Sequence, residues 1–144
     1  MIAIDTNVLL RYLLDDDDLQ AEKARRLFNA NKKILITDVV LAETIWTLKG
    51  KRYNAKKEDL TAIVFGLLAE PHVVFENQQA VWYALNDYMN AQPIKTANGT
   101  KQADFADALI SHKAQAVATQ QGETYWGTYT FDKAALAING TVLL

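Results

Sequence analysis

The 144-residue chain contains no cysteine, which excludes disulfide bonds, thiolate catalysis and the cysteine-rich classes of zinc site. No apolar run approaches the roughly 20 residues that a membrane-spanning helix needs. No basic segment precedes a long apolar one at the N-terminus, so we expect no signal peptide. These absences are compatible with the reducing cytoplasm, which is the location we expect.

An excess of positive charge is also missing. Fifteen basic residues against 17 acidic ones give a formal net charge of −2, so the chain as a whole does not attract nucleic acid. A nucleic-acid role would need a local basic patch. The concentrated basic stretch is Lys49, Lys51, Arg52 and 56–57, with Tyr53 inside it. Such a run is usually a solvated helix end and loop, and contact with RNA or a protein partner is the alternative.

Half of the residues are hydrophobic, which predicts a packed core and, at this length, one domain over residues 1–144. Short apolar segments alternate with amphipathic ones, which predicts an α/β fold with a parallel sheet and helices on both faces. Residues 91–101 are predicted to be a mobile loop. The expected strands are 1–4, 34–37, 72–75, 124–130 and 141–144, and the expected helices are 8–14, about 18–30, 39–49, 60–68, 78–89 and 104–120.

Four adjacent aspartates, 15–18, follow the first predicted helix. A calcium loop of the EF-hand type spaces its ligands at alternate positions and needs a glycine and a distant Glu, which are missing here. The run is better explained as a solvated turn. Asp17, with Gln20 three residues later, would cap the next helix.

Two carboxylates directly follow predicted strands. Asp5 ends the first apolar run, with Thr6 or Asn7 expected to cap the following helix, and Asp132 follows the strand that ends at Thr130. Ligands bind at the carboxyl ends of the strands in an open α/β sheet. A helix-capping role is the alternative for Asp5.

Three further carboxylates lie on predicted helices. Glu43 sits in the middle of a nearly apolar helix with Asp38 as its expected cap. A carboxylate among aliphatic side chains is costly unless it is paired or metal-bound, although an exposed position remains open for it. Asp104 and Asp107 are neighbours on the first turns of another helix. Favourable charge at a helix N-terminus explains one of them well and two less well.

The chemistry of these acids follows from their mutual repulsion. Two unit charges ~4 Å apart repel by ~4 kcal/mol at an effective dielectric of about 20, so a cluster of them would bind protons or a cation. Ligands made only of oxygen favour Mg²⁺ or Mn²⁺, and we interpret both histidines, His72 and His112, as structural. A metal-bound cluster of acids suits phosphoryl chemistry, in which a bound water attacks phosphorus.

Four segments, residues 5–10, 37–43, 104–110 and 130–132, resemble the PIN-domain ribonucleases, and in particular the VapC-type toxins of bacterial toxin–antitoxin pairs. The resemblance implies a three-layer α/β/α sandwich with a mainly parallel sheet. It also implies Mg²⁺- or Mn²⁺-dependent cleavage of RNA, a homodimer, and an antitoxin that blocks the site.

Two alternatives to a nuclease are considered. One is a PIN-like module that is catalytically inactive and binds RNA or protein, and the other is a phosphatase of the haloacid dehalogenase type. The phosphatase is disfavoured because it needs a second Asp two residues after the first, where this chain has Asn.

The resemblance also assigns roles to individual residues. The implied catalytic acids, which would also bind the metal, are Asp5, Glu43, Asp107 and Asp132, and Asp104 is a further metal ligand. The supporting residues are Thr6, Asn7 and Thr130, and the candidate contacts to RNA or the partner are Arg11, Lys49, Lys51 and Arg52.

Overall fold

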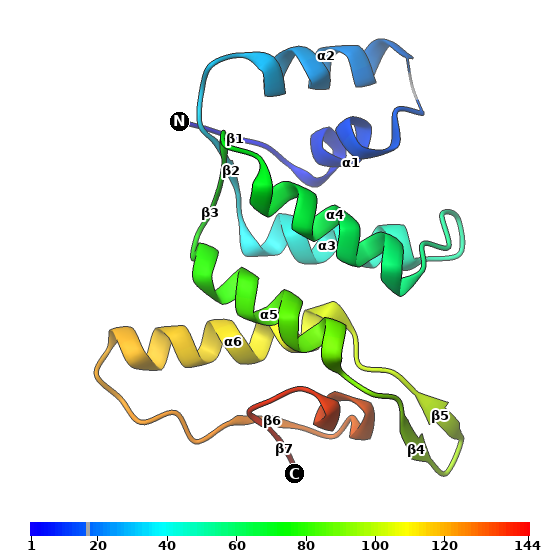
Figure 1. Cartoon of the computed structure of the whole chain (residues 1–144), viewed down its shortest axis with the longest axis vertical. Coiled ribbons are helices and arrows are strands. Elements are labelled where there is room, and N and C mark those ends of the chain that lie inside the picture. The colour runs from blue at the N-terminus through cyan, green and yellow to red at the C-terminus, as the bar shows by residue number, and fades with distance from the viewer. Residues whose placement is uncertain (17) are drawn as a thin grey trace. The chain divides into compact units, whose positions relative to one another are not determined.

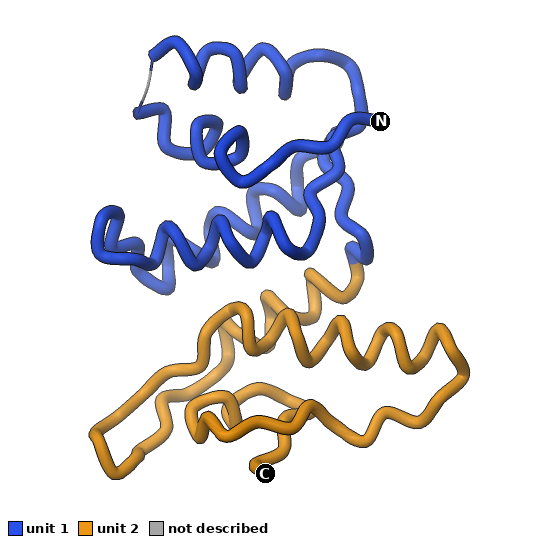
Figure 2. The backbone as a smooth tube through the Cα atoms, turned by 180° about the vertical axis from the view of Figure 1, so that it is seen from behind, with its two compact units in different colours: residues 1–78 blue, residues 79–144 orange. Residues whose placement is uncertain are grey.

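Helices and short strands alternate along the chain, as the apolar pattern predicts. The computed structural model describes residues 1–16 and 18–144, and these form six α-helices and two sets of parallel strands (Figure 1). The predicted α/β class is therefore confirmed. The chain divides into a first unit, Met1–Gln78, and a second unit, Gln79–Leu144 (Figure 2). No helix in the described ranges combines the length and apolar character that crossing a bilayer would require.

The first unit is built on a sheet of three parallel strands in the order β1-β2-β3. Ile2 pairs with Ile34, and Ile34 pairs with Val73. Ile34 and Leu41 are completely buried, because the sheet and the helix α3 both contribute apolar side chains to the core. The elements are β1 (Ile2–Ala3), α1 (Thr6–Leu14), α2 (Asp18–Asn29), β2 (Ile34–Ile36), α3 (Asp38–Lys49), α4 (Lys57–Ala69) and β3 (Val73–Phe75).

Two helices of this unit begin earlier than predicted, α1 by two residues and α3 by one. Asp5, and not Thr6 or Asn7, caps α1, and its carboxylate accepts a hydrogen bond from the Val8 N–H at 2.9 Å. Thr37, and not Asp38, caps α3. Both caps lie just after a strand and keep its extended backbone, which is the conformation that an N-cap needs. The predicted cap at Asp17 lies outside the described residues.

The second unit contains a parallel pair and an antiparallel pair of strands. β6 and β7 are parallel, with Thr128 opposite Thr141, and β4 and β5 form a hairpin. The helix α5 leads into this unit from the first. The elements are α5 (Gln78–Asn90), β4 (Ile94–Thr96), β5 (Gly99–Lys101), α6 (Phe105–Gln120), β6 (Thr128–Thr130), a 3₁₀ helix (Lys133–Ala137) and β7 (Thr141–Leu143).

Two predictions for the second unit are wrong. Residues 91–101 contain the β4–β5 hairpin, in which the Thr96 hydroxyl donates to the Gly99 carbonyl at 2.7 Å. Its exposed strands lack the apolar alternation that would have identified them. The predicted strand 124–130 is reduced to its last three residues, because Gly127 has a φ of +119°, outside the range of extended backbone. A Cβ at this position would also lie 2.7 Å from the Val142 side chain, so the close approach requires glycine.

A buried carboxylate ties the second unit together. Asp87 of α5 is 9% exposed and accepts hydrogen bonds from the Asn139 backbone N–H at 2.9 Å and from its side-chain amide at 3.1 Å. The His112 Nε2 of α6 lies 2.9 Å from the same carboxylate. An ionised carboxylate only accepts hydrogen bonds, so His112 donates here. This contact supports the structural interpretation of His112.

Candidate active site

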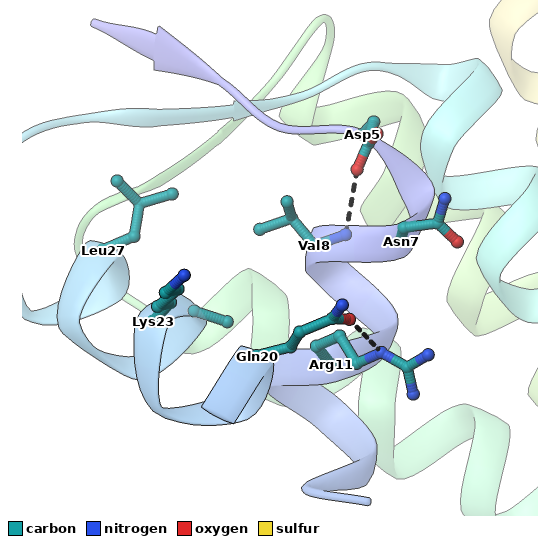
Figure 3. A pocket seen from close by; sticks show the side chains of 8 residues that line it. Asp5, Asn7, Val8, Arg11, Gln20, Lys23 and Leu27 are labelled. Atoms are coloured by element: carbon teal, nitrogen blue, oxygen red, sulfur yellow. Dashed lines mark hydrogen bonds between the residues drawn. The ribbon is translucent and has the colours of Figure 1, made fainter. Parts of the chain in front are cut away.

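Asp5 is held in place by its role as a helix cap. It follows β1, its side chain is exposed, and its Oδ1 accepts from the Val8 N–H. Its Oδ2 makes no hydrogen bond to the described residues. Figure 3 shows the carboxylate above the first turn of α1, with Asn7 on one side. The capping and functional interpretations of Asp5 are therefore compatible, because the cap uses one oxygen and orients the other.

Glu43 is linked to the residue that follows Asp5. The Thr6 hydroxyl donates to Glu43 Oε2 at 2.5 Å, which is short, as expected for a hydrogen bond to a charged acceptor. This contact joins the first turn of α1 to the middle of α3. Glu43 is exposed, so of the two positions considered for it, the exposed one is observed. It shares the outer face of α3 with Val39 and Trp46, which are 69% and 68% exposed.

Asp104 and Asp107 lie at the start of α6. Asp104 is the N-cap, and its backbone N–H donates to Asp107 Oδ2 at 2.8 Å. A carboxylate at this position of a helix favours the first turn, both through the hydrogen bond and through the positive end of the helix dipole. Both acids therefore have a local role at the start of α6. Asp104 is its N-cap, and Asp107 accepts the hydrogen bond from the N-cap backbone.

Asp132 repeats the arrangement of Asp5. It follows β6, its side chain is exposed, and its Oδ1 accepts from the Ala134 N–H of the 3₁₀ helix at 2.9 Å. Its own N–H donates to the Thr130 hydroxyl at 3.0 Å. Thr130 thus contacts Asp132, one of the acids of the site that Thr130 is predicted to support. Asp132 and Asp5 each have one carboxylate oxygen fixed by a helix start.

The contacts of the predicted acids are described separately for each unit. In the first unit, Thr6 connects the position beside Asp5 to Glu43. In the second unit, Asp107 contacts the backbone of Asp104. Across residues 1–16 and 18–144 there is no group of three or more His, Asp or Glu side chains arranged to hold a metal ion. The five-acid cluster is therefore still a prediction, since the acids are placed only within their own units (Figures 1 and 2).

The donor set of the first unit fits a hard divalent cation. Mg²⁺ is usually bound by one or two carboxylates and keeps several of its waters. Asp5 and Glu43 supply exposed carboxylates, and no cysteine or histidine accompanies them. Oxygen ligands of this kind favour Mg²⁺ or Mn²⁺ over softer metals.

A cavity of about 270 Å³ between α1 and α2 adjoins Asp5 (Figure 3). No sequence pattern indicates this cavity, because it depends on how the two helices pack. Lys23 of α2 lines it, as does Gln20, which accepts from the Arg11 Nε at 2.9 Å. Figure 3 shows the Arg11 guanidinium group pointing away from Lys23. The stem of Arg11 therefore lines this cavity while its charge lies elsewhere.

Arg11 also binds Asp16, with its Nη1 2.6 Å from the carboxylate. This hydrogen bond, with smaller attractions to Arg11 and Arg52, holds the pKa of Asp16 below its usual range. We expect Arg11→Gln to raise the pKa of Asp16, as measured by NMR titration of its carboxyl carbon. Because the folded-state pKa is the lower one, the contact favours folding above the unfolded-state pKa and is lost as pH falls. An unchanged pKa in the variant would contradict this assignment.

The comparisons with known proteins agree with the pattern of acids. The sequence profile of the PIN domain matches residues 2–121. The matched range includes Asp5, Glu43, Asp104 and Asp107, and it ends before Asp132. A search of curated proteins found no matching sequence. Because the match covers well over half of the chain, the protein belongs to the PIN-domain family, whose members are generally metal-dependent nucleases.

Proposed function

We propose that the protein is an endoribonuclease that hydrolyses RNA phosphodiester bonds with Mg²⁺ or Mn²⁺, as a single PIN domain over residues 1–144. One observation carries the proposal. At the end of β1, Asp5 has one oxygen fixed by a helix cap, and the next residue, Thr6, fixes Glu43. Two exposed carboxylates are thereby oriented by neighbouring residues of one short segment. A preorganised pair of this kind suits cation binding better than solvated side chains do.

The residues of the chain would divide the work between them. The divalent ion, when bound, supplies a water of lowered pKa and stabilises the departing oxygen. Asp5 and Glu43 bind and orient it from the first unit. In the proposal, Asp107 and Asp132 complete the set and Asp104 is a further ligand. The hydrogen bonds of Asp107 and Asp132 to helix starts hold one oxygen of each carboxylate in position.

The assay that tests the proposal uses end-labelled single-stranded RNA and the purified chain. We expect cleavage with Mg²⁺ or Mn²⁺, none in EDTA, and recovery when the ion is added back. Glu43→Gln keeps the size of the side chain and removes its charge, so it should need more metal for the same rate. Absence of cleavage with either ion would leave the inactive binding module as the better description. Undiminished cleavage in EDTA would refute the role of the metal.

Thr6 offers a narrower test, because its hydroxyl is the group that orients Glu43. We expect Thr6→Val to lower activity at limiting Mn²⁺ by roughly 10-fold, the lower end of the effect of removing a group that orients a metal ligand. Thr6→Ser retains the hydroxyl and should stay near the wild type. The measurement is the Mn²⁺ concentration that gives half of the maximal rate. If the valine and serine variants behaved alike, the hydroxyl would have no role in the site.

We further propose that the nuclease is the toxin of a VapBC-like pair, acting in the cytoplasm as a homodimer that a cognate antitoxin inhibits. The support is the four-segment resemblance. Expression in bacteria should stop growth, and Asp5→Asn should relieve the arrest. A neighbouring small gene for a DNA-binding protein, whose product binds this chain and blocks cleavage, would identify the antitoxin. Normal growth with an enzyme that cleaves RNA in vitro would remove the toxin role and leave the nuclease in place.

A further inference from the structure

A second cavity of the first unit is lined by basic side chains. It has a volume of about 290 Å³ and lies between α1, the end of α3 and the turn that follows. Arg11, Lys51 and Arg52 line it, and these three residues define what we call the basic cavity. Asn7 and Arg11 also line the cavity beside Asp5. The two cavities therefore adjoin, because Asn7 and Arg11 line both.

The three cations come from the C-terminal ends of two helices. Arg11 lies in the last turn of α1, and Lys51 and Arg52 follow Lys49, the last residue of α3. Cations are favourable at a helix C-terminus, and Arg11 also binds Asp16. The packing of α1 beside the end of α3 places these cations around one cavity, which the stability of either helix alone does not require.

The cations are held in position by other groups. In the turn after α3, the Asn54 N–H donates to the Gly50 carbonyl at 2.7 Å and the Ala55 N–H donates to the Leu48 carbonyl at 2.9 Å. The Arg52 guanidinium lies 5.1 Å from the centre of the Tyr53 ring, within the range of a cation–π contact. An arginine already oriented loses less entropy when it binds an anion, and its planar group matches two phosphate oxygens.

We infer that the basic cavity binds a phosphate group of the RNA strand, next to the bond that is cleaved near Asp5. The inference rests on the proposed function for the identity of the strand. Two facts carry it: cations from two separate elements line one cavity, and this cavity shares Asn7 and Arg11 with the one that contains Asp5. Tyr53 is a positioning residue that acts through Arg52.

The test measures the affinity of the full chain for fluorescein-labelled single-stranded RNA by anisotropy, in EDTA so that no cleavage occurs. The double variant Lys51→Ala/Arg52→Ala is compared with Lys32→Ala/Lys33→Ala. The control removes the same charge from two exposed lysines of the same unit, outside the cavity. Thermal melting verifies that both variants are folded.

Loss of the one phosphate contact on a single strand should make the slope of log K against log salt shallower by about 0.7 and weaken binding by roughly fivefold at 0.1 M salt. The control should remain within about twofold of the wild type. Equal weakening by the two double variants, or no weakening by the cavity variant, would overturn the inference. Inorganic phosphate at constant ionic strength should compete with RNA for the wild type more effectively than for the cavity variant.

The nuclease proposal and the cavity can fail separately. If the wild type cleaves RNA and the cavity variant binds and cleaves it equally well, the cavity inference fails and the nuclease proposal stands. If the wild type binds RNA through the cavity and never cleaves it, the cavity inference stands and the nuclease proposal fails. If the wild type binds no RNA, the cavity inference is wrong.

Discussion

Asp5→Asn is expected to lower the rate of RNA cleavage by roughly 100-fold or more, as does removal of a group that stabilises charge in other active sites, and to leave the fold intact. The reason lies in the two functions of the side chain. Asn is as good an N-cap as Asp, so it can accept the hydrogen bond from the Val8 N–H, 2.9 Å long in the wild type. It is neutral, so it cannot compensate the charge of a divalent ion.

Asp5→Ala separates the cap from the charge. This variant loses both, and we expect its free energy of unfolding to fall by about 1 kcal/mol, while cleavage is lost as in Asp5→Asn. Glu58→Gln, at an exposed acid in the first turn of α4, removes a charge elsewhere in the same unit and should cleave normally. Single-turnover rates at saturating Mn²⁺, with urea unfolding, give both quantities. Equal rates for the wild type and Asp5→Asn would mean that Asp5 is a structural cap and no more.

The parts of the fold that the sequence predicted are those set by local patterns. The predicted helix 78–89 matches α5 (Gln78–Asn90), because apolar residues recur at helical spacing. The buried strands β2 and β3 were recognisable as short apolar runs. Asp5 and Asp132 were recognisable as acids at the ends of strands, because each carboxylate closely follows a short run of residues typical of strands.

Which individual helix residues are buried and which are exposed could not be predicted from the sequence. α3 is apolar on nearly every side, and Val39 and Trp46 are exposed, so its pattern could not show on which face Glu43 lies. The stripe predicted as core on α5 is buried at Val81 and Leu85, but Trp82 is 43% exposed. Such facts depend on which neighbour covers each face, and that neighbour is distant in the sequence.

Asp87 is the clearest case of a residue that no local pattern identified. It is one of two neighbouring polar residues of α5 and would be expected to face water. It is buried because its partners, His112 on α6 and Asn139 after the 3₁₀ helix, meet it from elsewhere in the second unit. Three hydrogen-bond donors compensate for its loss of hydration. These donors are distant from Asp87 in the sequence, so no local pattern predicts its burial.

Asp87→Ala is expected to lower the free energy of unfolding by about 3 kcal/mol, at roughly 1 kcal/mol for each buried donor left without its acceptor. The truncation leaves the Asn139 N–H, its side-chain amide and the His112 ring without their acceptor. At 2–4 °C per kcal/mol, a chain of this size should melt roughly 10 °C lower. Glu123→Ala, at an exposed acid of the same unit, should stay within about 0.5 kcal/mol of the wild type. Urea unfolding followed by circular dichroism measures both variants.

Asp87→Asn distinguishes the hydrogen bonds from the packing. Asn has nearly the same shape, and a carbonyl in the place of Oδ2 can still accept from the Asn139 N–H and from His112. Its NH2 group would then take the place of Oδ1 and set a donor against the side-chain amide of Asn139. If hydrogen bonding to the carboxylate holds these segments together, Asp87→Asn should lose a substantial part of the stability that Asp87→Ala loses. If filling the space were what mattered, Asp87→Asn would unfold at the wild-type urea concentration and only Asp87→Ala would be weakened. Wild-type stability in both variants would show that the second unit does not depend on this carboxylate.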